Sequence, residues 1–260
     1  MKCIRLIIFL FPFFVLSQEK ITINLKDSIQ LKVEKIWGID TFGTIYASKE
    51  DDTFFKKTKD TLVTYTNYQL GEVTSANAFN PLRINLFYQD FNTVIILDNR
   101  LAEISKIDFN TQSEYKNVTF ISTGYSNTLW LYNQDKQYLE LYDYINDTIL
   151  VKTVPVQAKV LDLKSDYNYC YLLTEEALYI YNYFGSLEKT IPNLGYERMA
   201  FSKANLILKG KNKLSLLQKN KSEISPIEYP EMLINQFLVT NESLYLYNDN
   251  KLTEYQLKIE

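Results

Sequence analysis

The stretch "LYLYNDNKLTEYQL" at residues 244–257 has the pattern of a β-hairpin. Apolar and polar residues alternate on both sides of a short polar turn, and a period of two places the apolar side chains on one face of each strand. Asn and Asp tolerate the tight backbone of hairpin turns. A closely similar stretch, "LWLYNQDKQYLELY", occupies residues 129–142, so the hairpin is a repeated unit.

Six such hairpins follow one another along the chain, beginning at Thr44, Thr93, Thr128, Tyr169, Leu206 and Ser243. Successive starts are 49, 35, 41, 37 and 37 residues apart. A repeat of about 40 residues built from strands alone predicts the blades of a β-propeller. We therefore expect an all-β fold of about six blades, each with four antiparallel strands. An open repeat array and a split β-sandwich are the alternative architectures.

The segments around the hairpins supply the other two strands of each blade. An apolar segment ahead of each hairpin predicts an innermost strand, at residues 33–40, 81–90, 118–125, 158–166, 197–203 and 234–240. Residues 61–68 and 148–154 predict outermost strands. The long first interval leaves room for an insertion near residues 69–80.

The segment "KITINLKD" at residues 20–27 is an alternating strand without a hairpin of its own. The sixth hairpin ends close to Glu260, so its blade lacks an outermost strand. Pairing the two would close the ring and cover a strand edge that otherwise invites aggregation. We expect residues 20–27 to complete the sixth blade.

The first residues predict a secretory signal peptide over residues 1–18, followed by one propeller domain over residues 19–260. Lys2 and Arg5 precede an apolar run at residues 6–16, and Ser17 supplies a small residue at its exit. Eleven apolar residues are too few for a membrane-spanning helix. The cleaved protein is thus expected in the periplasm or outside the cell, without a membrane span.

The composition excludes several classes of site. The chain has no histidine, which rules out Ser-His-Asp and Cys-His catalysis and histidine metal centres. Removal of the signal peptide leaves Cys170 as the one cysteine, which we expect to be buried and inert. Seven scattered glycines form no phosphate loop, so no cofactor is expected. The cleaved chain carries 26 basic and 31 acidic side chains, which does not favour nucleic-acid binding.

Carboxylate chemistry is the enzymatic class that survives, because a pair of acids is what many glycoside hydrolases require. Acids at or beside the predicted inner strands are Asp40, Asp90, Asp162, Asp166 and Glu197. We favour the other interpretation, that these acids end strands and start turns. Residues 49–52 and 248–250 offer oxygen ligands for calcium but lack the spaced series of a calcium loop. No catalytic, cofactor-binding or metal-binding residue is therefore assigned.

Tyrosine-rich runs at residues 142–147 and 179–184 suit either a recognition surface, including one that stacks on carbohydrate, or packing between blades. We favour packing. Sequons for N-glycosylation begin at Asn117, Asn146, Asn220 and Asn241. The triplets at residues 27–29, 60–62 and 147–149 resemble the O-glycosylation motif of Bacteroidota.

The hairpin pattern of residues 20–260, which has no Trp-Asp dipeptide, resembles that of divergent β-propellers. The leader ending "VLSQ" and the Lys-, Asn- and Tyr-rich chain also resemble exported proteins of Bacteroidota. Small periplasmic propellers of that kind include accessory subunits of outer-membrane machinery, such as the plug subunit of the type 9 secretion translocon. The resemblance implies a non-catalytic scaffold with a protein partner in the cell envelope. A carbohydrate-binding or glycan-cleaving propeller is the alternative, and a sensor or structural module of a larger assembly is a third.

Overall fold

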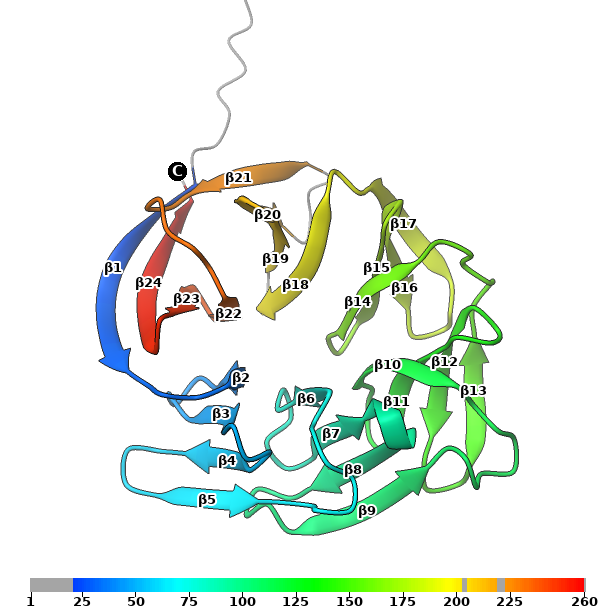
Figure 1. Cartoon of the computed structure of the whole chain (residues 1–260). Helices are drawn as coiled ribbons and strands as arrows, with labels where there is room; N and C mark the ends of the chain where they lie inside the picture. Colours follow the sequence, from blue (N-terminus) through cyan, green and yellow to red (C-terminus); the bar gives the residue numbers. More distant parts are fainter. Residues whose placement is uncertain (1–20, 203–204, 219–222, 260) are drawn as a thin grey trace, which may run out of the picture.

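The chain forms a ring of β-sheets around a central axis (Figure 1). The structure, a computed structural model, describes residues 21–202, 205–218 and 223–259. Within these residues the regular elements are twenty-four strands and one short 3-10 turn, η1 (Gln89–Phe91). The strands make six four-stranded blades, so the predicted β-propeller is confirmed.

The first three blades follow one another in sequence. Blade 1 consists of β2 (Lys35–Ile39), β3 (Ile45–Ser48), β4 (Phe54–Lys57) and β5 (Leu62–Tyr65). Blade 2 consists of β6 (Ser75–Asn77), β7 (Ile84–Tyr88), β8 (Thr93–Leu97) and β9 (Glu103–Asp108). Blade 3 consists of β10 (Val118–Thr123), β11 (Thr128–Asn133), β12 (Tyr138–Asp143) and β13 (Thr148–Lys152).

The next three blades complete the ring. Blade 4 consists of β14 (Val160–Ser165), β15 (Tyr169–Thr174), β16 (Ala177–Asn182) and β17 (Leu187–Pro192). Blade 5 consists of β18 (Tyr196–Ser202), β19 (Asn205–Gly210), β20 (Lys213–Gln218) and β21 (Ile224–Glu228). Blade 6 consists of β22 (Gln236–Thr240), β23 (Ser243–Asn248), β24 (Lys251–Ile259) and β1 (Ile21–Gln30).

Strand β1 closes the ring, as the sequence predicted. It runs antiparallel to β24, with Ile21 opposite Ile259 and Gln30 opposite Lys251, and the two lie side by side in blue and red in Figure 1. Its first two residues also pair in parallel with Ile227 and Glu228 of β21. Blades 5 and 6 therefore share one continuous eight-stranded sheet.

Blade 2 departs from the predicted strand assignment. The hairpin that starts at Thr93 supplies the third and fourth strands of this blade, whereas the other five hairpins supply the second and third. The segment 81–90, expected to be innermost, instead contains β7, the second strand. The innermost strand is β6, a three-residue strand inside the supposed insertion at residues 69–80. Its sequence, Ser-Ala-Asn, carries no apolar alternation that could have marked it.

The side chains of the middle strands build the core between blades. Each of six apolar clusters lies between two neighbouring blades. In β19, for example, Leu206 and Leu208 pack toward blade 4 while Ile207 packs toward blade 6. Because side chains of a strand point alternately to its two faces, one strand serves two interfaces. The middle strands must then be apolar at nearly every position.

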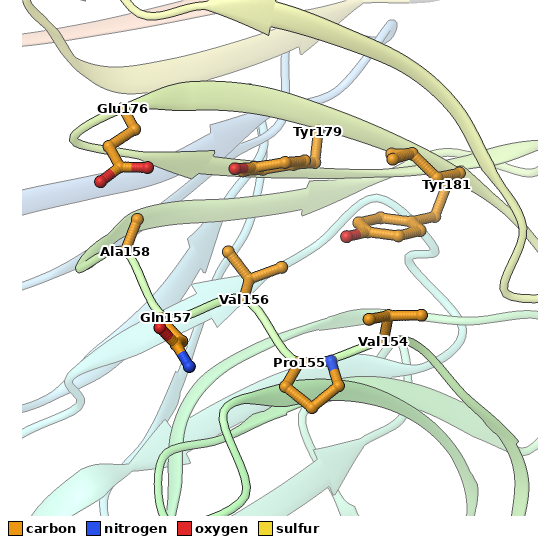
Figure 2. Close-up of a pocket in the computed structure, with 9 residues that line it drawn as sticks. Val154, Pro155, Val156, Gln157, Ala158, Glu176, Tyr179 and Tyr181 are labelled. Atoms are coloured by element: carbon orange, nitrogen blue, oxygen red, sulfur yellow. The ribbon is translucent and has the colours of Figure 1, made fainter.

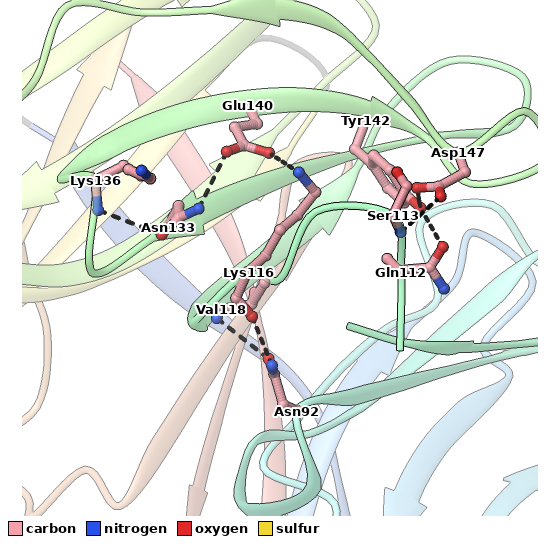
Figure 3. A network of polar contacts seen from close by, with 10 residues as sticks. All are labelled: Asn92, Gln112, Ser113, Lys116, Val118, Asn133, Lys136, Glu140, Tyr142 and Asp147. Atoms are coloured by element: carbon pink, nitrogen blue, oxygen red, sulfur yellow. Dashed lines mark hydrogen bonds and ion pairs between the residues drawn. The ribbon is translucent and has the colours of Figure 1, made fainter. Parts of the chain in front are cut away.

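A buried polar network ties the connection after blade 2 to blade 3 (Figure 3). Lys116 and Glu140 are almost fully buried, and Lys116 Nζ lies 3.0 Å from Glu140 Oε2. Asn133 Nδ2 donates to Glu140 Oε1 at 3.1 Å, and Asn92 Nδ2 donates to the Lys116 carbonyl at 2.6 Å. Asn92 Oδ1 also accepts the Val118 amide, so one side chain satisfies backbone groups on both sides of Asn117, where the connection enters β10.

Candidate functional site

The strand directions define two faces of the ring. Since consecutive strands of a blade are antiparallel, the turns between its first and second strands lie on one face, together with those between its third and fourth strands. We call this the turn face. The remaining turns and the connections between blades lie on the opposite face. Arg83 donates to Ser126 O and Asn127 Oδ1, which joins the turn-face loops of blades 2 and 3.

Two of the candidate acids hold turns on this face. Asp40 Oδ1 accepts the amides of Phe42 and Thr44, both at 2.9 Å. Asp166 Oδ1 accepts the amides of Asn168 and Tyr169 at 2.7 and 2.6 Å. A side chain that bonds the backbone two residues ahead is typical of Asp at the start of a turn.

The other candidate acids occupy unrelated positions. Asp162 is buried in β14, where its Oδ2 accepts the Met199 amide of blade 5 at 2.8 Å and its Oδ1 lies 3.5 Å from Lys164 Nζ. Asp90 lies in η1 on the opposite face, and Glu197 is exposed on β18. The structure thus assigns four of the five acids to turns or blade contacts and does not gather the set into one pocket.

The residues considered for calcium also belong to hairpin turns. Asp51 Oδ1 accepts the Thr53 amide at 3.2 Å, and Asn248 Nδ2 donates to Asp249 Oδ2 at 3.0 Å. Among the residues that the structure describes, there is no group of three or more acidic or thiol side chains arranged to hold a metal ion.

Charges near the axis are mixed in sign. Lys35 on the innermost strand β2 donates to the Thr74 carbonyl at 3.2 Å, and its Nζ lies 4.0 Å from the centre of the Trp37 ring. Burial lowers the pKa of Lys35, and Arg198 and Lys164 lower it further, while Glu72 opposes the shift. Arg198 donates to the Leu161 carbonyl at 2.8 Å. These contacts join inner strands and supply no pair of carboxylates.

Exposed aromatic residues stand at the turn-face loops of four successive blades. Phe42 is 94% exposed, Phe79 40%, Tyr125 45% and Tyr167 69%, in the first turns of blades 1, 2, 3 and 4. Leu82, 63% exposed, lies in the same loop as Phe79. A large apolar side chain at the same place in consecutive repeats is a feature of a recognition surface. We call these five residues the aromatic turn patch.

Local hydrogen bonds explain how these loops present apolar tips. Asn77 Oδ1 accepts the Phe79 amide at 2.9 Å, and Asn80 Oδ1 accepts the Leu82 amide at 3.0 Å, just as Asp40 accepts that of Phe42. Each polar side chain is turned back onto its own backbone. The apolar residue two positions later is left facing outward.

Ring contacts connect parts of the patch across blades. The rings of Phe79 and Tyr167, from blades 2 and 4, have centroids 4.9 Å apart, although blade 3 separates these blades in the ring. The ring centroids of Tyr125 in blade 3 and Tyr183 in blade 4 are 5.4 Å apart. The two contacts make the loops of blades 2, 3 and 4 one surface.

The tyrosine-rich runs mainly pack between blades. Tyr142 is fully buried and Tyr181 is 3% exposed, while Tyr144, Tyr179 and Tyr183 are half-buried. Cys170 is fully buried in the core between blades 3 and 4, and burial raises the pKa of its thiol well above the usual value. The predicted burial of this cysteine is confirmed.

The modification motifs lie in different settings. Asn146 and Asn241 are exposed, Asn117 is half-buried and donates to Asp135 Oδ1 at 2.7 Å, and Asn220 lies outside the described residues. Ser28, Thr61 and Thr148 are exposed and lie on or beside outermost strands. The predicted signal peptide also lies outside the described residues.

Comparison with known proteins bears on the fold. No family model and no curated protein matches the sequence. Virginiamycin B lyase from Staphylococcus aureus, crystallised with quinupristin, is similar in structure with a TM-score of 0.61 and 11% identity over 93% of this chain and 96% of the lyase. A streptogramin B lyase is similar with a TM-score of 0.61 and 13% identity over 94% of this chain and 89% of the lyase. A chain of the mitotic checkpoint complex is similar with a TM-score of 0.58 and 9% identity over 98% of both chains.

At these identities the likeness shows the fold alone. Within the described residues, the structure contains no helix with the length and apolar character needed to cross a membrane. Its described residues form a six-bladed β-propeller in which strand β1 completes the last blade.

Proposed function

We propose that this chain is a non-catalytic propeller that binds a protein partner through the aromatic turn patch. The observation that carries the proposal is the exposed aromatic residue at the first turn of four successive blades. Asp40, Asn77 and Asn80 are engaged in hydrogen bonds within these turns, which leaves Phe42, Phe79 and Leu82 facing outward. An apolar, aromatic centre is typical of protein interfaces.

The candidate acids support this choice over glycan cleavage. Asp40 and Asp166 accept backbone amides of their own turns, and Asp162 joins blades 4 and 5. The lyase neighbour was crystallised as a catalytically inactive histidine-to-alanine variant, whereas this chain has no histidine. Lyase chemistry that depends on such a residue is not transferred to this chain.

The proposal includes export and a place in the cell envelope, as an accessory of outer-membrane secretion machinery. Its support is the charged and apolar leader at residues 1–18 together with the resemblance to exported Bacteroidota propellers. N-terminal sequencing of the protein from a host that processes it should give a chain starting at Gln18 or Glu19. A chain that retains Met1 would contradict export by this route.

Two variants of matched exposure test the binding surface. Phe42→Ser combined with Tyr167→Ser alters the turn face, and Tyr68→Ser combined with Tyr115→Ser alters the opposite face, where these residues are 92% and 55% exposed. A partner purified in stoichiometric amount with the native protein should lose at least about tenfold in affinity for the first variant, as loss of interface aromatics predicts. The second variant should bind normally.

Equal binding of both variants would place the interface elsewhere. Recovery of soluble glycans with no stoichiometric protein would instead favour the carbohydrate-binding alternative, since exposed aromatic rings also stack on sugars.

A further inference from the structure

Two pairs of aromatic rings lie close together on the turn face of blades 2, 3 and 4. Phe79 is packed against Tyr167 and Tyr125 against Tyr183, and the ring planes are inclined to each other by 52° and 51°. The Tyr183 hydroxyl donates to the carbonyl of Asp166 at 2.6 Å, and Asp166 directly precedes Tyr167. The two ring pairs are therefore adjacent and form one aromatic surface.

The outer turn of blade 4 adds another exposed ring to this surface. Phe184, in the turn between β16 and β17, is 88% exposed. Asn182 Oδ1 accepts the amides of Phe184 and Ser186 at 2.9 and 3.1 Å, so this turn is built like the other turns that present an apolar tip. Aromatic side chains thus extend from the inner turn of blade 4 to its outer turn.

The charged side chains beside these rings are engaged within the protein. Arg83 donates to Ser126 O and Asn127 Oδ1 in the inner turn of blade 3. Asp166 Oδ1 accepts two amides of its own turn, and Asp143 Oδ1 accepts two amides of the outer turn of blade 3. Charge complementarity therefore favours a ligand segment that carries no charge of its own.

Hydrogen-bonding groups on the same turns favour a ligand that supplies acceptors. The carbonyl of Tyr125 accepts both the amide and the hydroxyl of Thr128, at 2.9 and 2.6 Å, and the Asn182 carbonyl accepts the Gly185 amide at 3.0 Å. These acceptors are used by the turns themselves. The hydroxyls of Tyr125 and Tyr167, in contrast, are donors on exposed side chains.

A proline-rich segment combines these properties. Proline has no backbone N–H, so a run of prolines presents carbonyl acceptors without donors. Such a run adopts the extended polyproline II helix, which has no internal hydrogen bonds and is formed before binding, so little conformational entropy is lost. Surfaces lined by aromatic side chains are the usual docking sites of these segments.

We propose that the aromatic turn patch on blades 2, 3 and 4 binds a proline-rich, uncharged segment of the protein partner in the polyproline II conformation. The pairs Phe79–Tyr167 and Tyr125–Tyr183 receive the pyrrolidine rings, and the hydroxyls of Tyr125 and Tyr167 donate to carbonyls of the segment. This inference rests on the proposed function, because it names the chemistry of the partner that the patch recognises.

The test uses a capped peptide, acetyl-Gly-Pro-Pro-Pro-Pro-Pro-Pro-Gly-amide, and the same peptide with alanine in place of every proline. Each is titrated into the full-length protein with amide NMR spectra as the readout. The proline peptide should bind with a dissociation constant in the millimolar range or below and shift resonances of residues 125–128, 166–169 and 183–186. The alanine peptide should bind at least about tenfold more weakly, because it lacks the rings and carries amides that the surface leaves unpaired.

Variants separate the ring surface from its hydroxyls. Tyr167→Ser removes a ring and should weaken binding of the proline peptide at least about tenfold. Tyr125→Phe combined with Tyr167→Phe keeps both rings and should weaken binding about fivefold through the lost hydrogen bonds. Tyr115→Phe, at an exposed tyrosine of the opposite face, is the matched control and should bind like the native protein. Because all these residues are exposed, thermal unfolding should change little.

The outcomes distinguish this inference from the proposed function. Equal binding of the two peptides, or undiminished binding of the proline peptide by Tyr167→Ser, would overturn the inference. Saturable binding of methyl β-glucoside at these residues without binding of the proline peptide would also overturn it. If the proline peptide fails to bind while the native partner still loses affinity for the variant with Phe42→Ser and Tyr167→Ser, the proline-rich ligand is wrong and the protein-binding function stands.

Discussion

Blades 3 and 6 have the same four-stranded architecture, but they are assembled by different means. Blade 3 is one continuous segment, and a buried lysine–glutamate pair ties it to the connection that precedes it. Blade 6 combines three strands near the C-terminus with β1, which lies more than 200 residues earlier in the sequence. The interactions that complete blade 3 are close in sequence, whereas those that complete blade 6 join the two ends of the described chain.

This difference separates two contributions to the stability of the ring. In blade 3, the neighbouring connection is fixed by polar groups that would be costly to leave unpaired. In blade 6, backbone pairing and apolar contacts must offset the loss of chain entropy that comes from bringing distant segments together. Substitutions in each blade should therefore differ in size and in the way they can be rescued.

The largest effect should come from a charge placed where β1 enters the core. Ile21 is 1% exposed between blades 5 and 6, so Ile21→Asp should lower the free energy of unfolding by about 5 kcal/mol through lost burial and an unpaired buried charge. Leu25→Asp on the same strand is the control, because Leu25 is 67% exposed and its substitution should change stability by about 0.5 kcal/mol. Urea unfolding monitored by circular dichroism compares them, and similar losses would contradict a closing role for Ile21.

The next effect concerns the buried pair of blade 3. Lys116→Met should cost about 4 kcal/mol, because it leaves Glu140 charged and buried without its partner. Adding Glu140→Gln should restore most of that loss, since the amide remains an acceptor for Asn133 without a charge. Chemical unfolding of the single and double variants measures the difference. A double variant as unstable as Lys116→Met would show that lost packing, and not the unpaired charge, causes most of the loss in unfolding free energy.

A smaller effect is expected at the passage from blade 6 to blade 1. Tyr247 Oη lies 3.0 Å from the Leu31 carbonyl and 2.9 Å from the Val33 carbonyl, and it accepts the Val33 amide at 3.3 Å. Tyr247→Phe should cost about 2 kcal/mol because it leaves these backbone groups without that partner. Tyr68→Phe, at a residue 92% exposed, should be neutral. Thermal unfolding compares the pair, and no loss in Tyr247→Phe would mean that water replaces the hydroxyl.

The smallest effect belongs to the ion pair on the outer side of blade 6. Lys26 Nζ lies 2.5 Å from Glu254 Oε1, and both side chains retain access to water. Partial burial acts to raise the pKa of Glu254, but hydrogen bonds from Lys26 and Ser243 outweigh it, so the pKa is lower than usual. The pair should thus contribute at most about 1 kcal/mol.

The direction of the pKa shift fixes the pH dependence. Because the folded-state pKa of Glu254 is below its value in the unfolded chain, the contribution is fully present above about pH 4.5 and is lost as the pH falls through the folded-state pKa. Lys26→Met should therefore differ from the native protein at pH 7 and approach it at pH 3. A difference that grows on acidification would contradict this assignment.

The repeat could be read from the sequence because the middle strands serve two blade interfaces, so short runs that are apolar at nearly every position recur along the chain. The same signal failed in blade 2. There β7 and β8 are both apolar and are joined by a short turn ending at Asn92 in the left-handed region, while β6 is three residues long. An apolar run predicts a strand but does not indicate which of the four positions in a blade that strand occupies.

The candidate sites were harder to read. Phe42, Phe79, Tyr125 and Tyr167 are single residues in otherwise polar turns, and only their similar place in successive repeats could have singled them out. A groove between blades 3 and 4 (Figure 2) is lined by Val154, from the connection between β13 and β14, and by Tyr179 and Tyr181 of β16, so its residues become neighbours only after folding. Apolar alternation along the strands contains no information about either surface.

The antiparallel pairing of β1 with β24 has a mechanical consequence. Ile21 is paired with Ile259 at one end of the two strands. Force applied between these two residues would break the backbone hydrogen bonds one pair after another, so the ring should open under a small load. Force applied between Gln30 and Ile259 would instead load all the pairs together in shear, and the same strands should resist far more strongly.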